Sequence, residues 1–342
     1  MIDFSSDTQT RPTRAMREAV LDAETGDERH DACPTTLDLN RRVAALFGME
    51  AAVFLPSGTM CNEIAIAVHT RPGDEVICAR ESHIIFAESG GPAALSGVMM
   101  HPLDAERGLF TPDQVAAALR PPSSFAPRSR LLVTEQTSNL GGGAVWPVDQ
   151  LNAVARTARD HGLAAHLDGA RVLNASVATG VPAADYARHH DSAWLAFTKG
   201  LGCPVGAVLA GSAQFIRDAW LLKRRWGGAM RQTGVLTAMC LHALDHHVDR
   251  LADDHAMARD LGADLAAAPI VKRVLPVETN IVVAELADSA PDADTVCARL
   301  RERGVKVGRI GRRKLRLLTH LDASVDDARA AVAAVQGLTV EA

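Results

Sequence analysis

The stretch at residues 194–211, WLAFTKGLGCPVGAVLAG, decides the fold, because two apolar runs flank a glycine-rich turn in it. Its only charged residue is Lys199. The two runs have the length and composition of buried β-strands. Burying an ammonium group costs free energy unless the group is paired, neutralised or used chemically. The stretch therefore indicates a buried sheet with a lysine of special purpose at its edge.

The sequence around this stretch alternates short apolar runs with segments whose apolar residues recur at helical spacing. We expect strands at 51–55, 74–79, 129–135, 163–168, 193–198 and 205–211, and helices between them at 59–70, 111–120 and 147–162. Such alternation is typical of an α/β fold with a mostly parallel central sheet and helices on both faces.

In the C-terminal part of the sequence, helix-like and strand-like segments follow one another in a different order. Helical spacing at 213–226 and 238–264 is followed by a strand at 280–286, a helix at 293–303, a strand at 314–320 and a helix from Val325. This order predicts a smaller α+β domain. We therefore expect a large domain with its N-terminal segment at 1–245 and a small C-terminal domain at 246–342.

Composition excludes several classes of function. The 342 residues carry a formal net charge of -5, which gives no electrostatic reason to expect a nucleic-acid or membrane partner. The six cysteines form no C-x-x-C pair, and no leader-like or membrane-spanning apolar run occurs. We expect a cytoplasmic protein with a small-molecule substrate.

Two interpretations of the turn after Lys199 compete. Gly200, Gly202 and Gly206 have the spacing of a dinucleotide-binding turn, but that turn requires a helix directly after it. Pro204 and a strand follow instead, which disfavours this interpretation. In the other, Lys199 is an amine of lowered pKa that forms an imine with an aldehyde, and pyridoxal phosphate fits best.

Pyridoxal phosphate needs a carboxylate that keeps its pyridine nitrogen protonated. Asp168 ends the strand of AAHLDGAR, one strand–helix–strand unit before Lys199. Both side chains are then expected at the carboxyl edge of the sheet, where open α/β folds bind ligands.

The phosphate group needs hydrogen-bond donors. FLPSGTMCNEIAIA predicts a strand, a turn and a helix, which places Ser57, Gly58 and Thr59 at a helix N-terminus. The alternative is that Ser57 only caps the helix.

An amino-acid substrate needs a guanidinium group for its carboxylate. Arg171 and Arg316 are the candidates, although the periodicity of LRLLTH alone favours Arg316 on a solvent-exposed face. The cofactor ring also needs a group above it. His83, which opens the loop ESHI, is the candidate.

Together these motifs resemble a known family. SSDTQTRPT, LPSGT, ESHI, HLDGARV, FTKGLGCPVG, GGAMRQTG and LRLLTHLD occur in the order found in the low-specificity L-threonine aldolases. These belong to the β-eliminating lyase group of fold-type I pyridoxal phosphate enzymes. The resemblance extends from residue 2 to about residue 325.

The resemblance implies a role for each matching residue. Lys199 would hold the cofactor as an aldimine, Asp168 would bind the pyridinium, and His83 would stack on the ring and face the substrate hydroxyl. The phosphate would be bound by Gly58, Thr59 and Thr198, and the substrate carboxylate by Ser6, Arg171 and Arg316.

The resemblance also implies an oligomer with shared active sites. Arg231 of GGAMRQ, and Arg224 with it, would reach the phosphate from a neighbouring subunit. A homodimer is then the minimum, and a homotetramer is expected.

The implied reaction is retro-aldol cleavage of a β-hydroxy-α-amino acid such as threonine or allo-threonine. It would give an aldehyde and, through a glycine quinonoid, glycine. The alternative within the same cofactor chemistry is β-elimination with deamination of a β-substituted amino acid. A non-catalytic binding protein is disfavoured because Lys199, Asp168 and the phosphate turn are all present.

The chain departs from the family pattern near the substrate. Ser138 of EQTSN stands where a second histidine often holds the β-hydroxyl group, and serine is no base near neutral pH. His30 and Cys33 of HDACPT replace a tyrosine and an acid. These changes leave open which substrate is preferred and whether the base is His83, His30 or water.

One further cluster resembles a metal site. His247, Asp254 and His255 recur near helical spacing, but a solvated helix face explains them with fewer assumptions. We therefore predict no metal. We interpret Cys203, beside the lysine turn, as a small apolar filler.

Overall fold

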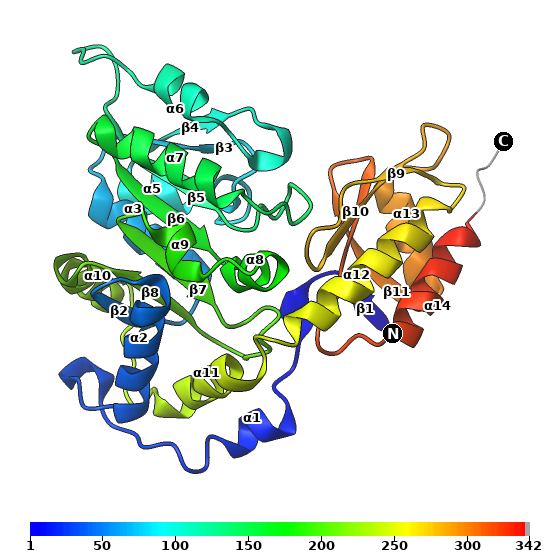
Figure 1. The fold of residues 1–342 in the computed structure, drawn as a ribbon, viewed down its shortest axis with the longest axis horizontal. Helices are drawn as coiled ribbons and strands as arrows, with labels where there is room; N and C mark the ends of the chain where they lie inside the picture. The colour runs from blue at the N-terminus through cyan, green and yellow to red at the C-terminus, as the bar shows by residue number, and fades with distance from the viewer. Residues whose placement is uncertain (339–342) are drawn as a thin grey trace.

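A computed structural model describes residues 1–338, so the last four residues of the predicted small domain, 339–342, lie outside it. Its larger sheet has seven strands in the order β2-β8-β7-β6-β5-β3-β4 (Figure 1). The pairs from β4 through β3, β5 and β6 to β7 are parallel, and β8 is antiparallel to both β7 and β2. The strands are β2 (Ala51–Leu55), β3 (Glu75–Ala79), β4 (Met99–Leu103), β5 (Ser129–Glu135), β6 (Ala164–Gly169), β7 (Ser192–Ala196) and β8 (Ala207–Gly211).

Both faces of this sheet are covered by helices, because its strands present apolar side chains alternately to either side. On β7, Leu195 packs into one core and Trp194 into another. One face meets α2 (Pro34–Phe47), α6 (Pro112–Ala118), α7 (Val148–Asp160), α8 (Val172–Thr179), α9 (Ala183–Ala187) and α11 (Gly234–His246). The other meets α3 (Gly58–His69) and α10 (Ala213–Arg225), and α5 (Gly91–Ser96) packs against α3.

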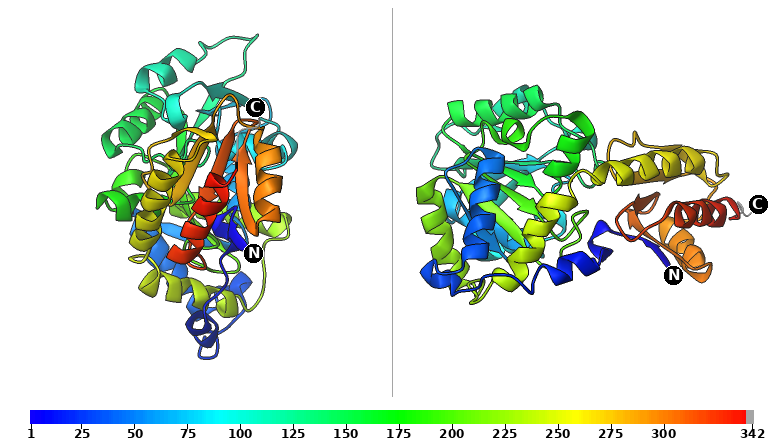
Figure 2. Two further views of the ribbon diagram at one scale, coloured as in Figure 1. Left: turned by 90° about the vertical axis from the view of Figure 1, so that its right-hand side faces the viewer. Right: turned by 60° about the horizontal axis from the view of Figure 1, so that its bottom comes forward.

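The second sheet forms a smaller lobe at one side of the large one, and the N-terminus lies in it (Figures 1 and 2). Its order is β1-β11-β12-β10-β9, with β1 (Ile2–Phe4), β9 (Val271–Val274), β10 (Ile281–Leu286), β11 (Val305–Ile310) and β12 (Lys314–Leu318). The helices α12 (Leu251–Ala266), α13 (Ala293–Glu302) and α14 (Val325–Gln336) pack with this sheet around one core.

The α/β prediction, with its mostly parallel sheet and smaller α+β part, is confirmed. The sequence did not predict β1, β4, β9 or β11. The helix predicted at 238–264 is wrong as one element, because α11 ends at His246 and α12 begins at Leu251. The domain boundary near residue 246 stays a prediction.

Short helices connect these elements. They are α1 (Arg14–Glu18), α4 (His83–Phe86) and the 3-10 turns Asp7–Gln9, Glu28–His30 and Glu106–Gly108. Within residues 1–338, no helix has the length and apolar composition needed to cross a membrane.

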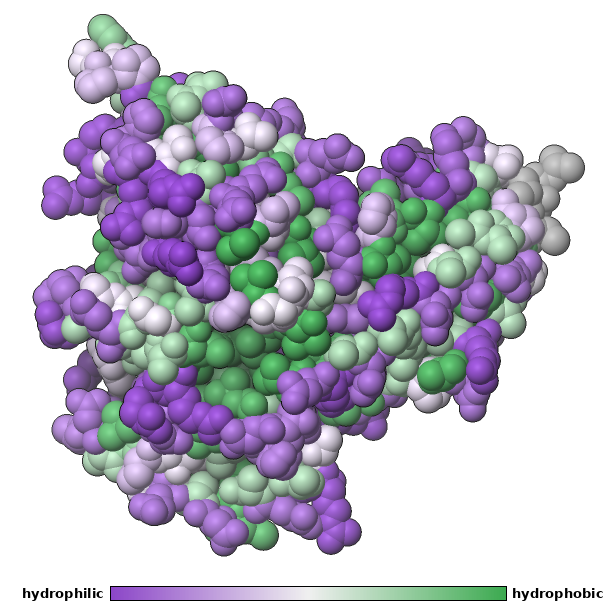
Figure 3. Space-filling model, viewed as in Figure 1, coloured by the Kyte–Doolittle hydropathy of each residue, from purple (hydrophilic) through white to green (hydrophobic). Residues whose placement is uncertain are grey.

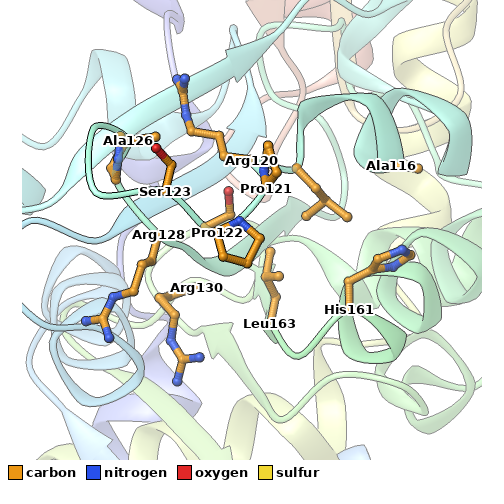
Figure 4. Close-up of a pocket in the computed structure, with 13 residues that line it drawn as sticks. Ala116, Arg120, Pro121, Pro122, Ser123, Ala126, Arg128, Arg130, His161 and Leu163 are labelled. Carbon is orange, nitrogen blue, oxygen red and sulfur yellow. The ribbon is translucent and has the colours of Figure 1, made fainter.

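An open pocket of about 550 Å³ lies at the loop after α6, bordered by Arg120, Arg128, Arg130 and His161 (Figure 4). Arg120 pairs with Glu75, and Arg128 pairs with Asp74. Two of the three guanidinium groups that border this pocket are therefore already paired with a carboxylate. None of the residues that line the pocket belongs to the site predicted from sequence.

Candidate active site

The carboxyl ends of β5, β6 and β7 bring the predicted catalytic residues together. Strand register places Glu135 of β5 beside Asp168 of β6, and Asp168 beside Trp194 of β7. Lys199 follows β7 by three residues and interacts electrostatically with Asp168 and Glu135. The edge predicted from sequence is thus where these side chains meet.

The environment of Lys199 favours a neutral amine. Burial lowers the pKa of Lys199 to about 8, and Arg171 lowers it as well, while Asp168 and Asp7 oppose the shift. The Nζ atom lies 5.4 Å from the centroid of the Trp194 ring. A lysine with a lowered pKa has a larger nucleophilic fraction near neutral pH, as an imine-forming lysine requires.

Asp168 is fixed by neutral donors. Its Oδ2 accepts a hydrogen bond from Asn62 Nδ2 at 2.8 Å, and its Oδ1 accepts one from the backbone N–H of Ala170 at 3.1 Å. Asp168 is 1% exposed, and it forms no ion pair with a Lys or Arg among residues 1–338. This buried carboxylate, which no Lys or Arg of the described residues contacts directly, fits the protonated pyridine nitrogen of the cofactor.

His83 is held at the first turn of α4 by two carboxylates. Its backbone N–H donates to Glu135 Oε2 at 2.7 Å, and its Nδ1 lies 2.8 Å from Glu88 Oε1. Burial alone would lower the pKa of His83, but the hydrogen bond with Glu88 and nearby Asp168 outweigh burial and raise it. Sequence reasoning missed Glu88 and Asn62, since nothing in the local pattern distinguishes them from other polar residues.

The expected phosphate turn lies at the N-terminus of α3. The Ser57 side chain caps the helix by accepting from Met60 N–H, and the N–H groups of the first turn have no partner within the helix. A Cβ atom at Gly58 would collide with the ring of Trp194. Glycine therefore lets α3 approach β7, close to the turn that contains Thr198 and Lys199.

The arginines predicted for the substrate carboxylate lie near each other but differ in their partners. Arg171 donates from Nε and Nη2 to the two carboxylate oxygens of Asp7, at 2.7 and 2.8 Å. Arg316 Nη1 donates to Asn139 Oδ1 at 3.2 Å, and its buried Nε has no partner within the described chain. Arg316 thus retains free donor capacity.

The interpretation of Arg316 as solvent-exposed, which periodicity alone favoured, is wrong. Burial, and after it the neighbouring charge of Arg171, lower the pKa of Arg316 to about 10. The physical reason is that the second face of the small sheet meets the large lobe instead of water, so alternation on β12 does not separate core from solvent. Ser6 directly precedes Asp7 in the sequence. Its Oγ caps the turn that begins at Asp7.

Four of the predicted site residues are not in contact with this cluster. His30, Arg224 and Arg231 are exposed, and Arg231 pairs with Asp27. Ser138 is 5% exposed, and a Cβ atom at Gly108 would lie 2.5 Å from its Oγ. Its hydroxyl is thus packed beneath the turn at Gly108.

The histidine cluster of the C-terminal half has a structural role. His247 Nδ1 bonds to the Leu201 carbonyl, and His255 Nε2 lies 3.1 Å from Asn174 Nδ2. Both, and Asp254 as well, are buried, so the expected solvated helix face is wrong. The described residues contain no group of three side chains that could hold a metal ion.

With this geometry in place, comparison with known proteins gives the family. The family model described as β-eliminating lyase matches residues 3–289. The chain belongs to this family and, within it, to the low-specificity L-threonine aldolases. It is 39% identical to a probable low-specificity L-threonine aldolase 2 of Arabidopsis thaliana, over 93% of this chain and 92% of the relative. It is 36% identical to the low specificity L-threonine aldolase of Escherichia coli K12, over 95% of each.

Solved structures show the same fold. A Leishmania major threonine aldolase superposes with a TM-score of 0.83 at 22% identity, over 98% of this chain and 99% of that one. A structure titled SPT with PLP internal aldimine superposes with a TM-score of 0.72 at 16% identity, over 98% and 86%. The fold-type I prediction is confirmed, and pyridoxal phosphate is the cofactor of this family.

Proposed function

We propose that this threonine aldolase family member cleaves a β-hydroxy-α-amino acid of the threonine type to glycine and an aldehyde. The observation that carries the proposal is the meeting of Lys199, Asp168 and His83 at one edge of the sheet. The names of the relatives, low-specificity L-threonine aldolases, support the same reaction.

Bound pyridoxal phosphate supplies an electron sink for the negative charge left on the substrate α-carbon. Lys199 provides the amine that attaches the cofactor, and its lowered pKa leaves a larger fraction of that amine neutral and reactive near neutral pH than an ordinary lysine would have. Asp168 stabilises the proton on the pyridine nitrogen. Ser57, Gly58, Thr59 and Thr198 are proposed to hold the phosphate group.

Arg316 and Arg171 are proposed to bind the substrate carboxylate, with Ser6 beside them. Arg316 has a free Nε donor, and Asp7 holds Arg171 in one orientation. A carboxylate fixed in this way fixes rotation about the bonds of the α-carbon. It therefore decides which of these bonds is aligned for cleavage.

His83 is proposed to take the proton from the β-hydroxyl group. It lies beside Asp168, whereas His30 is exposed and contacts none of the cluster within one chain. Ser138 cannot act as a base near neutral pH. Because the Ser138 hydroxyl is packed under Gly108, we propose more space beside the β-carbon than a histidine would leave, and hence a broad side-chain preference.

Product identification on the cofactor-loaded protein tests the proposal. The protein is offered L-threonine, L-allo-threonine, L-phenylserine and their D counterparts, with Lys199→Ala protein as the control. Glycine with the matching aldehyde is expected from the L substrates. A keto acid with ammonia would establish the alternative, β-elimination, and no product from any substrate would contradict both.

We further propose a cytoplasmic homo-oligomer, at least a dimer and expected as a tetramer, in which Arg224 and Arg231 approach a neighbouring site. Apolar residues gather in a hollow of the large lobe near α2 and α11 (Figure 3). On these two helices, Leu37 and Val235 are 43% and 41% exposed. This surface supports a subunit contact. The six cysteines are all free, which supports a reducing compartment.

A further inference from the structure

Behind His83 lie two buried carboxyl groups that the proposed reaction does not use. Glu63 on α3 is 3% exposed, and Glu88, two residues after α4, is 4% exposed. Neither oxygen of Glu63 has a hydrogen-bond partner within residues 1–338, and neither does Oε2 of Glu88. The backbone of Gly91 passes so close to the Glu63 carboxyl that a side chain there would collide with it. The pair is thus enclosed, and three of its four carboxyl oxygens lack a donor within the described residues.

The other oxygen of Glu88 connects this pair to the active site. Glu88 Oε1 lies 2.8 Å from His83 Nδ1 and accepts a hydrogen bond from Asn62 Nδ2 at 2.7 Å. The same Asn62 amide nitrogen donates to Asp168 Oδ2 at 2.8 Å. Trp194 Nε1 donates to Asn62 Oδ1 at 2.8 Å and so fixes which way the amide points. Glu88 therefore contacts His83 directly and is connected to Asp168 through Asn62.

We propose that Glu63 and Glu88 share one proton, and that this pair positions His83 with Nδ1–H toward Glu88 and Nε2 left as an acceptor. The inference deepens the proposed function and rests on it for the role of His83. Glu88 Oε2 has no donor within residues 1–338, and a proton on the adjacent Glu63 supplies one. Glu88 in turn accepts from Nδ1, which sets the tautomer of the imidazole, as a carboxylate does for the histidine of a hydrolase triad.

The electrostatics agree with this geometry. Burial, and then the adjacent Glu88, raise the pKa of Glu63 to about 8, because two neighbouring carboxylates cannot both ionise in a buried site. Asp168 and Glu135 also face His83, and Cys61 faces Glu88 with its thiol pKa raised well above the ordinary value by burial and by Asp168. When the shared proton is lost in alkaline solution, the Glu63–Glu88 pair carries a second negative charge. The pair then attracts the Nδ1 proton of His83 more strongly.

The experiment follows the imidazole ¹⁵N signals of His83 in histidine-labelled holoprotein through a pH titration. A His83→Gln protein assigns the signals. In the wild type we expect the neutral fraction of the imidazole to carry its proton on Nδ1, and, besides the titration of His83 itself, a second shift of the signals near pH 8, where Glu63 loses its proton. Glu63→Gln should retain the neutral-pH tautomer, because its amide also donates to Glu88, but should lack the shift near pH 8.

Glu88→Gln provides the matched comparison. It should also lack the shift near pH 8, and only this variant should alter the His83 signals near neutral pH, because only Glu88 contacts the imidazole. Turnover should fall roughly ten-fold or more in Glu88→Gln with cofactor absorption retained, and should stay within about two-fold in Glu63→Gln near neutral pH. Glu302→Gln, on the exposed surface of α13, should behave as the wild type in both measurements.

A wild-type titration without the shift near pH 8, or a Glu63→Gln protein that keeps it, would overturn the shared proton. Unchanged His83 signals in Glu88→Gln would overturn the positioning role. Because the signals are measured without substrate, these outcomes stand apart from a failure to release glycine, which would contradict the proposed function instead.

Discussion

Lys199 combines partial burial, a pKa of about 8 and a position at the end of a parallel strand. We expect Lys199→Ala to lose the visible absorption band of the bound cofactor and to reduce turnover by a factor on the order of 10³ or more, because no other amine replaces its attachment. Absorption spectra and steady-state rates of purified protein measure both effects. Lys272→Ala, at an exposed lysine of β9, is the control and should change neither. A retained band in Lys199→Ala would mean that another residue attaches the cofactor.

Asp168 carries the second prediction for a single residue. Asp168→Asn keeps the size of the side chain but removes the charge that holds the proton on the pyridine nitrogen. Cofactor should still bind, while kcat should fall by roughly 10² or more because the neutral ring is a poorer electron sink. Cofactor content and kcat are measured on the same preparation. A kcat equal to that of the wild type would contradict this role for Asp168.

The same residues show what the sequence can and cannot predict at this scale. Lys199 and Asp168 were found because each directly follows or ends an apolar strand, so that local pattern alone places them at the sheet edge. Glu88, Asn62 and Asp7 were missed. Apart from the contact of Glu88 with His83, five positions away, their importance comes from contacts with residues 26 to 164 positions away in the chain, which no local pattern encodes.

Among the secondary-structure elements, the turn that begins at Asp7 depends most on one ion pair. Asp7 and Arg171 form a bidentate pair, and both are almost fully buried. Burial alone would raise the pKa of Asp7, yet Arg171 and Lys199 hold it well below 3.8. A carboxylate with a depressed folded-state pKa stabilises the fold above its unfolded pKa, and this contribution is lost as pH falls below about 3.8.

We therefore expect Asp7→Asn to lower the free energy of unfolding by about 3–5 kcal/mol near neutral pH, since the Arg171 charge remains buried without its partner. The difference in unfolding free energy between Asp7→Asn and the wild type should shrink as the pH is lowered below the pKa of the unfolded carboxyl group. Urea unfolding at several pH values measures it. Asp288→Asn, at a carboxylate with an 89% exposed side chain, is the control. A difference that stays constant down to strongly acidic pH would contradict the assigned pair.

Six of the seven strands of the large sheet were predictable because both of their faces are apolar. Three of the four missed strands are of another kind: β4 contains His101 and Pro102 at a sheet edge, β9 exposes Lys272 and Arg273, and β1 has only three residues. Short or exposed edge strands carry little hydrophobic pattern. The break between α11 and α12 lacks Gly and Pro, so its sequence gave no sign of a helix end.

At the scale of the whole molecule, the active site depends on three distant parts of the chain. Asp7 belongs to the N-terminal segment, Arg171 lies two residues after β6 of the large sheet, and Arg316 lies on β12 of the small one. Strand β1 pairs with β11, about three hundred residues later, and so places Asp7 between the two lobes. Periodicity cannot report such pairing. This is why Arg316 was interpreted as exposed although the large lobe covers it.

The oligomer proposal makes a prediction about mixtures of inactive proteins. If Arg231 of one subunit serves the site of another, Lys199→Ala inactivates the site of its own subunit. Arg231→Ala then inactivates the site of the neighbouring subunit. Subunits of the two variants, unfolded and refolded together, should form hybrid dimers in which one site has both native residues. Random pairing then restores roughly a quarter of the wild-type activity.

Each variant refolded alone, and Lys199→Ala mixed with Arg225→Ala, complete the test. Arg225 is exposed at the end of α10, so the Arg225→Ala protein should be active by itself and should gain nothing from mixing. Affinity tags of two kinds verify that hybrids form. Verified hybrids of Lys199→Ala and Arg231→Ala that remain inactive would place Arg231 outside the neighbouring site. Its pairing with Asp27 would then be its whole role.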